Sequence, residues 1–155
     1  MNNMKKIRGK WGTPVWILVH FVCEFIDINY FNKHKLEVFN MLKTLCCNVP
    51  CPICSKHASN YLRKIDPRRI DTKNKLRVLF FTFHNYANRN SKSPQFMWAD
   101  LKKYRNVRIN AVVRAFLQTY PKQYYGNFNF TGNARRKIAY NFLKWLQKIP
   151  LRYND

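Results

Sequence analysis

Cys51-Pro52-Ile53-Cys54 is the most informative stretch of this chain. Two cysteines separated by two residues can close a small redox disulfide or supply two ligands to a metal ion. Because proline suits the first position of a helix, a helix is predicted to begin at Pro52 and to reach about Arg63. The unpaired N–H groups at such a helix start stabilise a thiolate and favour disulfide exchange. The spacing predicts an exposed Cys51 and a Cys54 that faces the interior.

The composition indicates a helical protein. The chain has 155 residues, which is enough for one domain with a substantial core, or for one domain with an appendage. Hydrophobic residues make up 46% of it and aromatic residues 16%, whereas glycine occurs only 4 times. Strand-rich folds need glycine in turns and bulges, so its scarcity favours helices joined by short loops. We therefore expect an all-α fold.

The apolar periodicity predicts where the helices lie. Thr13 offers an N-cap oxygen and Pro14 a first helical residue, so the first helix is predicted to begin there and to end at about Ile28. Further segments with helical spacing cover residues 33–47, 76–89, 97–104, 107–120 and 134–149. We expect residues 1–104 to form a helical bundle and residues 105–155 to form a basic, helical C-terminal extension.

Positive charge dominates the chain. There are 29 Lys and Arg residues against 7 Asp and Glu residues, a formal net charge of +22. A field of this size attracts polyanions, so the composition is compatible with contact to nucleic acid or another anionic surface. The charge by itself identifies no reaction.

The N-terminal segment shows no secretion signal. The first ten residues are basic and polar, and the apolar run at residues 15–26 is shorter than the roughly 20 residues that span a bilayer. We therefore expect no transmembrane segment and a protein made in the cytosol. With five cysteines and no export signal, chemistry or a metal explains the paired cysteines better than a structural disulfide scaffold.

Two helices each carry a flat ring and a hydrogen-bonding partner one turn apart. Trp16 and His20 are separated by four residues, and so are His84 and Asn88. Residues four apart project from the same face of a helix. Two such faces suit a slot for a planar heteroaromatic ligand.

Three motifs in this order resemble those of a known family. They are Trp11-Gly12-x-Pro14-x-Trp16-x3-His20, then Pro50-Cys51-x-x-Cys54-x-x-His57, then His84-Asn85-x-x-Asn88. The set resembles the Erv/Alr flavin-linked sulfhydryl oxidases, and the resemblance covers residues 11–104. It implies a five-helix bundle of the Erv/Alr flavin-binding type that binds FAD without a covalent bond and forms a homodimer. Small members of this family are common in large DNA viruses, which implies a place in the host cytoplasm or the virion.

The resemblance also implies an activity. Thiol-containing protein substrates would pass electrons to the Cys51–Cys54 disulfide, then to FAD and finally to O2, giving hydrogen peroxide. The substrate thiolate would attack Cys51, and Cys54 would lie beside the isoalloxazine. Because the chain has no second CxxC, substrates are expected to meet Cys51 directly.

Eleven residues are predicted to contact FAD by this resemblance. They are Gly12, Thr13, Trp16, His20, Cys54, His84, Asn85, Ala87, Asn88, Lys92 and Tyr104. Four depart from the family pattern: an arginine or similar residue is usual near Thr13, valine is usual where Ala87 stands, and Lys92 and Tyr104 each fall one position early. One deleted loop residue would explain both shifts.

Two alternatives stay open for the CxxC. In one, Cys51, Cys54 and His57 hold zinc with a fourth ligand from Cys46, Cys47 or His84. In the other, the chain is a basic nucleic-acid or scaffold-binding helical protein and the CxxC is incidental. The flanking motifs favour the flavin interpretation and a site without metal. The cysteines outside the motif, Cys23, Cys46 and Cys47, are expected to pack as small hydrophobes, with a dimer-linking or shuttle role as the alternative.

Overall fold

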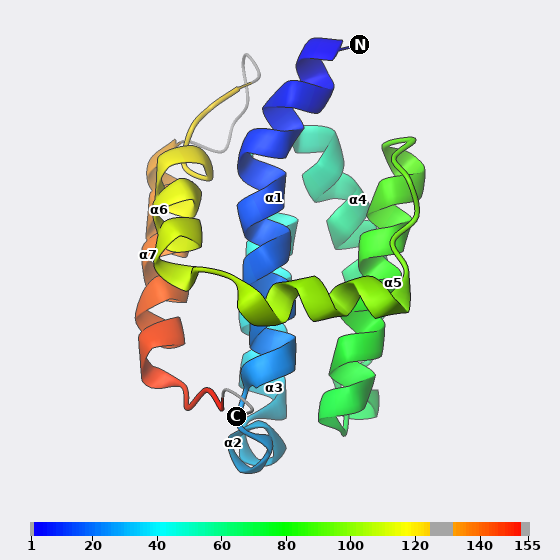
Figure 1. Cartoon of the computed structure of the whole chain (residues 1–155), viewed down its shortest axis with the longest axis vertical. Coiled ribbons are helices and arrows are strands. Elements are labelled where there is room, and N and C mark those ends of the chain that lie inside the picture. The colour runs from blue at the N-terminus through cyan, green and yellow to red at the C-terminus, as the bar shows by residue number, and fades with distance from the viewer. Residues whose placement is uncertain (1, 125–131, 153–155) are drawn as a thin grey trace.

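The computed structural model describes residues 2–124 and 132–152, and the regular elements in these ranges are all helical (Figure 1). The α-helices and two 3-10 helices (η) are α1 (Asn2–Phe25), α2 (Ile28–Lys33), α3 (Lys35–Cys47), α4 (Pro52–Leu62), η1 (Pro67–Arg69), α5 (Lys73–Asn90), η2 (Trp98–Asn106), α6 (Ile109–Thr119) and α7 (Gly132–Lys148). The predicted all-α class is confirmed. Within the described ranges, no helix is long and apolar enough to cross a membrane.

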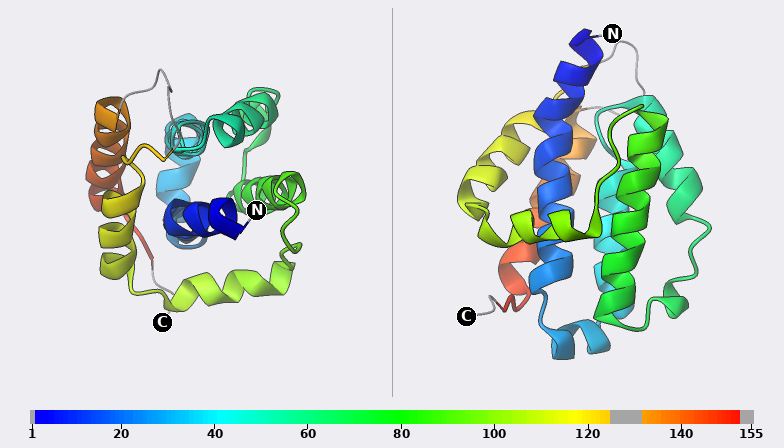
Figure 2. Two further views of the ribbon diagram at one scale, coloured as in Figure 1. Left: turned by 90° about the horizontal axis from the view of Figure 1, so that it is seen from above. Right: turned by 45° about the vertical axis from the view of Figure 1, so that its right-hand side comes forward.

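Helix α1 stands at the centre of the bundle (Figure 1). In the view from above in Figure 2, α3 and α4 lie on one side of it and α5 on a second. Helices α6 and α7 lie on the side opposite α5, and η2 runs across α1 to connect the two flanks. Helix α1 accordingly contacts α3, α5, α6 and η2.

The start of α1 differs from the prediction. The helix begins at Asn2, about three turns before Thr13, and Pro14 lies inside it. Proline inside a helix removes one backbone hydrogen bond and disfavours the helix at that point. Burial offsets this cost, because Trp11 and Val15 on either side are 6% and 3% exposed and both belong to the main core. Tertiary packing therefore carries the helix through a residue that usually starts one.

Helix α1 also ends earlier than predicted, at Phe25 rather than near Ile28. The next residue, Ile26, forms an isolated antiparallel bridge with Leu151 near the C-terminus. Asp27 then caps α2, where its carboxylate accepts hydrogen bonds from two backbone N–H groups. The capping residue therefore separates α1 from a short helix that the periodicity did not predict.

The C-terminal helices pack against the N-terminal ones. Helix α6 lies along α1, and α7 contacts α3. Phe116 and Phe142, from α6 and α7, are fully buried in the same hydrophobic cluster as the α1 residues. The buried hydroxyl of Tyr120 donates a hydrogen bond of 2.9 Å to the carbonyl oxygen of Leu45 in α3. Residues beyond 104 thus share the core of the bundle, and the division at residue 104 stays a prediction.

A buried carboxylate joins three elements on the other side of the bundle. Glu24, near the end of α1, has a side chain that is 6% exposed. It accepts a 2.7 Å hydrogen bond from Arg77 in α5 and lies 3.4 Å from the guanidinium of Arg105 in η2. Two cations on one carboxylate compensate for its removal from water and tie η2 to α1 and α5.

Candidate active site

The cysteine pair lies at the start of α4, as predicted. Cys51 is the N-cap residue, and Pro52 is the first residue of the helix. Cys51 and Cys54 form a disulfide, with 5.2 Å between their Cα atoms. The backbone N–H of Cys54 lies 3.3 Å from the Cys51 sulfur, which takes the place of an N-cap oxygen. A thiolate formed at Cys51 would therefore be stabilised by this N–H group and by the helix dipole.

The exposure of the two cysteines is the reverse of the prediction. Cys51 is only 2% exposed and packs in the main core with Val49, whereas Cys54 is half-buried and lines a cavity. The physical reason is a tight turn before the helix, in which the Cys51 N–H donates a 2.8 Å hydrogen bond to the Val49 carbonyl. Ile53, between the two cysteines, is 60% exposed. One apolar side chain is thus exposed at the CxxC, whereas Cys51 is buried.

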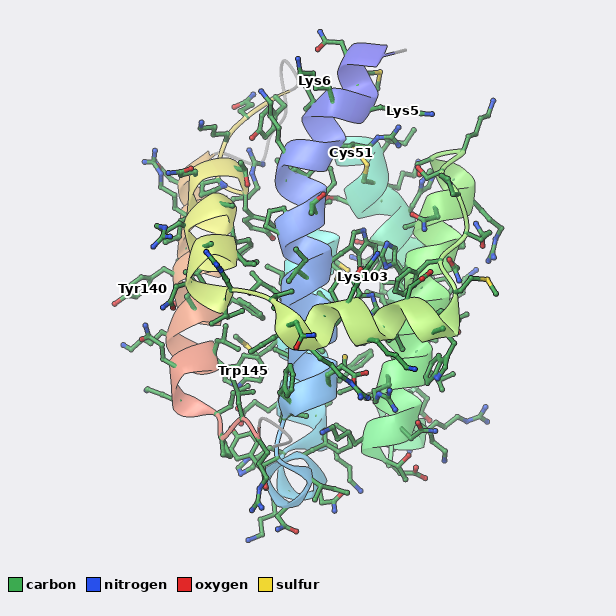
Figure 3. All side chains as sticks on the ribbon, in the orientation of Figure 1. Lys5, Lys6, Cys51, Lys103, Tyr140 and Trp145 are labelled. Atoms are coloured by element: carbon green, nitrogen blue, oxygen red, sulfur yellow. A yellow bond between two sulfur atoms is a disulfide. The ribbon has the colours of Figure 1, made fainter. Side chains whose placement is uncertain are left out.

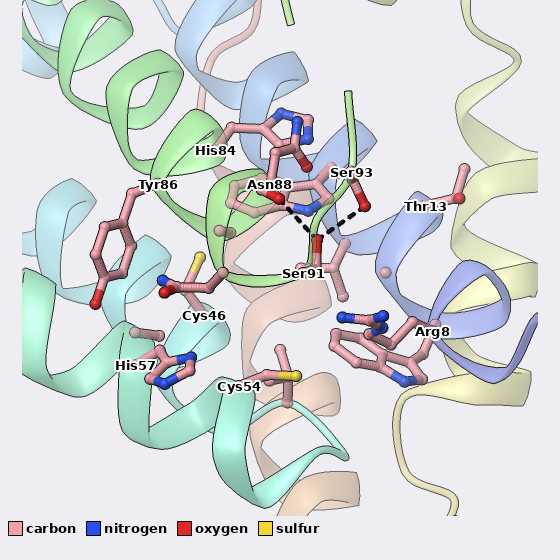
Figure 4. Close-up of a pocket in the computed structure, with 18 of the residues that line it drawn as sticks. Arg8, Thr13, Cys46, Cys54, His57, His84, Tyr86, Asn88, Ser91 and Ser93 are labelled. Atoms are coloured by element: carbon pink, nitrogen blue, oxygen red, sulfur yellow. Dashed lines mark hydrogen bonds between the residues drawn. The ribbon is translucent and has the colours of Figure 1, made fainter. Parts of the chain in front are cut away.

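The cavity that Cys54 lines has a volume of about 460 Å³ and lies between α1, α4, α5 and the end of α3 (Figure 4). This volume is typical of a site for a small organic ligand. Seven residues of the predicted FAD site line it, namely Gly12, Thr13, Trp16, Cys54, His84, Ala87 and Asn88. They come from three segments that are distant in the sequence, so tertiary folding brings the three motifs to one cavity.

Stacked aromatic rings form part of the cavity wall. The indole of Trp16 and the imidazole of His84 are stacked with 3.9 Å between centroids and an angle of 7° between planes. Phe83 tilts against the same indole at 5.4 Å. Flat, nearly parallel rings present a face that suits another planar ring system.

His20 and Tyr104 lie behind this wall and do not line the cavity. Nε2 of His20 is 2.9 Å from Nδ1 of His84, and the Tyr104 ring stacks on the other side of His20 at 4.8 Å. His20 is 1% exposed and Tyr104 is 5% exposed. In this structure His20 holds the orientation of His84 and Tyr104 packs against His20, and direct contact of either residue with a cofactor stays a prediction.

Burial keeps both imidazoles neutral. It lowers the pKa of His20 to about 3, with further lowering by the charges of His84 and Lys103. It also lowers the pKa of His84 to about 4, with Lys103 as the second cause. At neutral pH one ring therefore donates an N–H to the bare nitrogen of the other.

Asn85 faces the loop after α5 instead of the cavity. Its side-chain amide donates to the carbonyl of Phe96, and its side-chain oxygen accepts from the Phe96 N–H, each at 2.8 Å. Lys92 in the same loop is exposed, has a positive φ of 53° and does not line the cavity. Asn88 does line the cavity, while its amide donates to Pro94. This loop is therefore fixed to α5 by two asparagines of the third motif.

The sequence prediction missed residues from the first turns of α1. Lys5, Arg8 and Gly9 line the cavity together with the predicted Gly12. Their spacing of three or four residues is that of one helix face. This spacing was visible in the sequence, but only a helix that continues before Thr13 makes it relevant. His57, whose role was open, also lines the cavity.

The zinc interpretation finds no support in the geometry. Cys51 and Cys54 are joined to each other, and zinc requires thiolates. In the parts of the chain that the structure describes, no group of three or more His, Cys, Asp or Glu side chains is placed to hold a metal ion.

The fold and the site together define a helical redox protein whose disulfide lies beside an aromatic-walled cavity. A model of the Erv1/Alr family matches residues 13–107. The chain belongs to this family.

Viral proteins are among its relatives. An FAD-linked sulfhydryl oxidase from a Kenyan pig isolate of African swine fever virus is 24% identical over 122 residues, which cover 79% of this chain and 93% of the relative. The homologous protein from a Malawian tick isolate is 25% identical over 66% of this chain and 86% of its own length. A probable FAD-linked sulfhydryl oxidase of fowlpox virus is 30% identical over 63% of this chain and 94% of the relative. No solved structure matches the chain.

Proposed function

We propose that this chain is an FAD-dependent thiol oxidase that converts dithiols of protein substrates to disulfides. The observation that carries the proposal is the position of Cys54, because one half of the disulfide borders the same cavity as the stacked Trp16 and His84 rings. Membership of the family and the names of the viral relatives support it.

The residues present fit a flavin dinucleotide. The Trp16–His84 stack offers a planar face, and Gly12 leaves the wall of α1 open, since a Cβ built there meets nothing within 4 Å. The indole Nε1 of Trp11 is a buried donor with no hydrogen-bond partner among the described residues, and Trp11 lines the cavity. An unpaired buried donor beside a cavity is costly unless a ligand accepts its hydrogen bond.

FAD would be held by six residues that line the cavity, namely Gly12, Thr13, Trp16, His84, Ala87 and Asn88. Cys54 would lie next to it. We propose that His20, Asn85 and Tyr104 support this site from behind, and that Lys92 reaches it only from the loop surface. When bound, FAD supplies the acceptor that takes two electrons from the cysteine pair and passes them to O2, which gives hydrogen peroxide.

The thiol chemistry proceeds by two exchanges at the disulfide. A substrate thiolate attacks the Cys51 sulfur, so the Cys51–Cys54 bond breaks and Cys54 leaves as a thiolate. A second substrate thiolate then attacks the substrate sulfur of this mixed disulfide, which releases Cys51 as a thiolate. The substrate has lost two electrons and the enzyme pair has gained them. The N–H group and the helix start that face Cys51 stabilise this second leaving group.

The burial of Cys51 places a condition on the first exchange. A thiolate cannot reach a residue that is 2% exposed until the start of α4 opens locally. The exposed Ile53 marks the surface where a substrate would approach. We propose that substrate binding at this surface and local opening occur together.

Other expectations remain proposals. These are the homodimer, contact with nucleic acid or another polyanion, residence in the host cytoplasm or virion, and a division into a bundle of residues 1–104 and an extension of residues 105–155.

Purification followed by an oxygen-consumption assay tests the function. The chain should carry flavin, visible by its absorbance, and should consume O2 when a dithiol is added. A colourless protein with stoichiometric zinc would contradict the proposal, and so would a flavin-loaded protein that consumes no O2 with any dithiol.

A further inference from the structure

We propose that the first three turns of α1 form the subsite for the diphosphate of FAD, with Lys5 and Arg8 as its cations and Gly9 as the point of close approach to the backbone. This inference rests on the proposed function. It assigns a role to residues that precede the matched family segment of residues 13–107.

Four cavity-lining residues from the first turns of α1 lie on one face of this helix. Lys5, Arg8, Gly9 and Gly12 follow one another at intervals of three, one and three residues, and all four line the cavity that Cys54 borders. Figure 4 shows Arg8 at the cavity on the side of Thr13 and Cys54. Lys6 and Lys10, their neighbours in sequence, do not line it. The helix therefore presents two of its four early cations to the cavity.

The cavity is positively charged at this end. Among the described residues that line it, Lys5 and Arg8 are the cations other than histidine, and none is Asp or Glu. The diphosphate of FAD carries two negative charges. Arg binds phosphate oxygens in pairs and Lys binds them as a point charge, so this combination suits such a group. Lys92, assigned to FAD by the family resemblance, is exposed and outside the lining.

The glycines leave room beside the helix. A Cβ built on Gly9 or on Gly12 would meet nothing within 4 Å, so protein packing does not require glycine at either position. Glycine disfavours the interior of a helix relative to alanine. The open space lies on the cavity face, where a ligand could approach the backbone closely.

A buried donor on the same segment also lacks a partner. Trp11 is 6% exposed and lines the cavity, and its Nε1–H has no hydrogen-bond partner among the described residues. Buried indole N–H groups are nearly always paired. Independently of the charges, this donor indicates that a polar ligand completes this end of the cavity.

The test compares two double variants of the full chain, freed of flavin and titrated with FAD. Lys5→Ala with Arg8→Ala removes the proposed cations, and Lys6→Ala with Lys10→Ala removes the same charge from the same helix outside the cavity. The first variant should raise the Kd for FAD about tenfold or more over the second, which is on the order of one charge-assisted hydrogen bond. Its Kd should also depend less on NaCl concentration than that of the wild-type chain.

A second variant tests the open face without changing charge. Gly9→Leu should keep or raise the melting temperature of the flavin-free protein, because leucine is a better helix former, and should weaken FAD binding. Equal FAD affinity and equal salt dependence in the two double variants would overturn the inference, and so would unchanged FAD binding by Gly9→Leu. A wild-type chain that binds no FAD would overturn the proposed function as well. A wild-type chain that binds FAD, with variants that bind it equally well, would overturn only the diphosphate subsite.

Discussion

The imidazoles of His20 in α1 and His84 in α5 are joined by a hydrogen bond of 2.9 Å in the interior of the bundle. Trp16 stacks on the His84 side of the pair, and Tyr104 stacks on the His20 side. Stacking and this hydrogen bond thus link the four rings in series from the cavity wall to η2. The orientation of the ring that faces the cavity is thus set by three elements of the fold.

This pair predicts that the flavin-free protein loses stability in mild acid. The pKa values of both histidines are lowered by burial, to about 3 and about 4, from an unfolded value near 6.5. Between about pH 6.5 and pH 4 the unfolded chain binds protons that the folded chain does not, so the free energy of unfolding falls as the pH falls. The slope should reach up to about 1.4 kcal/mol per pH unit for each imidazole.

Urea unfolding at pH values from 4.5 to 8 measures this slope. His20→Gln should reduce it by about half, since one of the two imidazoles is removed. Above pH 7 the wild-type chain provides the control, because these histidines no longer contribute to the slope there. A slope that His20→Gln leaves unchanged would show that other groups cause the acid sensitivity.

The disulfide between Cys51 and Cys54 predicts that these two cysteines are required for turnover and that the free cysteine Cys47 is not. Cys51→Ser and Cys54→Ser should each abolish dithiol-dependent O2 consumption, because both sulfurs take part in the exchange. Cys54→Ser leaves Cys51 as a free thiol, so its thiolate should attack the disulfide form of a substrate, forming a mixed disulfide and releasing one substrate thiolate. Cys47→Ser is the control, since Cys47 is a half-buried free cysteine outside the cavity lining, and it should retain turnover. Full turnover in either active-site variant would refute the mechanism.

The Tyr120 hydroxyl should contribute measurably to stability. It is buried and donates to the Leu45 carbonyl, so Tyr120→Phe leaves that acceptor without this donor. We expect the free energy of unfolding to fall by about 1 kcal/mol. Tyr140→Phe is the matched control, because Tyr140 is 64% exposed, points away from the bundle (Figure 3) and can bond to water through its hydroxyl. Equal unfolding midpoints for the two variants would mean that α6 is held to α3 by apolar packing alone.

Asn85 should hold the loop after α5 in place. Asn85→Ala removes both of its hydrogen bonds to Phe96, leaving a backbone donor with no partner, which costs about 1–3 kcal/mol. The amide hydrogen of Phe96 should then exchange with solvent much faster than in the wild-type chain, as NMR or mass spectrometry can follow. Asn60→Ala, at an exposed position of α4, should leave that exchange rate unchanged. If the Phe96 amide hydrogen still exchanges slowly in Asn85→Ala, contacts other than those of Asn85 hold the loop in place.

Much of the site could be predicted from local sequence. The helix that begins at Pro52 follows from proline and the N-cap position of Cys51, which are properties of adjacent residues. The convergence of Trp16, Cys54 and His84 on one cavity was implied by the resemblance of three motifs to those of the Erv/Alr family. The first turns of α1 were not, because Thr13 and Pro14 are locally a helix start. Only the burial of Trp11 and Val15 makes the longer helix stable.

The sequence alone determined the all-α class and the helix start at the CxxC, since these depend on periodicity and capping along the chain. The disulfide and the FAD-binding role of the aromatic motifs were implied by the resemblance to a family. The tertiary structure decided that Cys51 is buried, that His20 lies behind His84, and that Lys5 and Arg8 reach the cavity. The physical reason is that exposure and ring contacts depend on which distant segments pack together. The sequence around Cys51 encodes a reactive pair, and the packing of the helices decides which of its sulfurs meets the cavity.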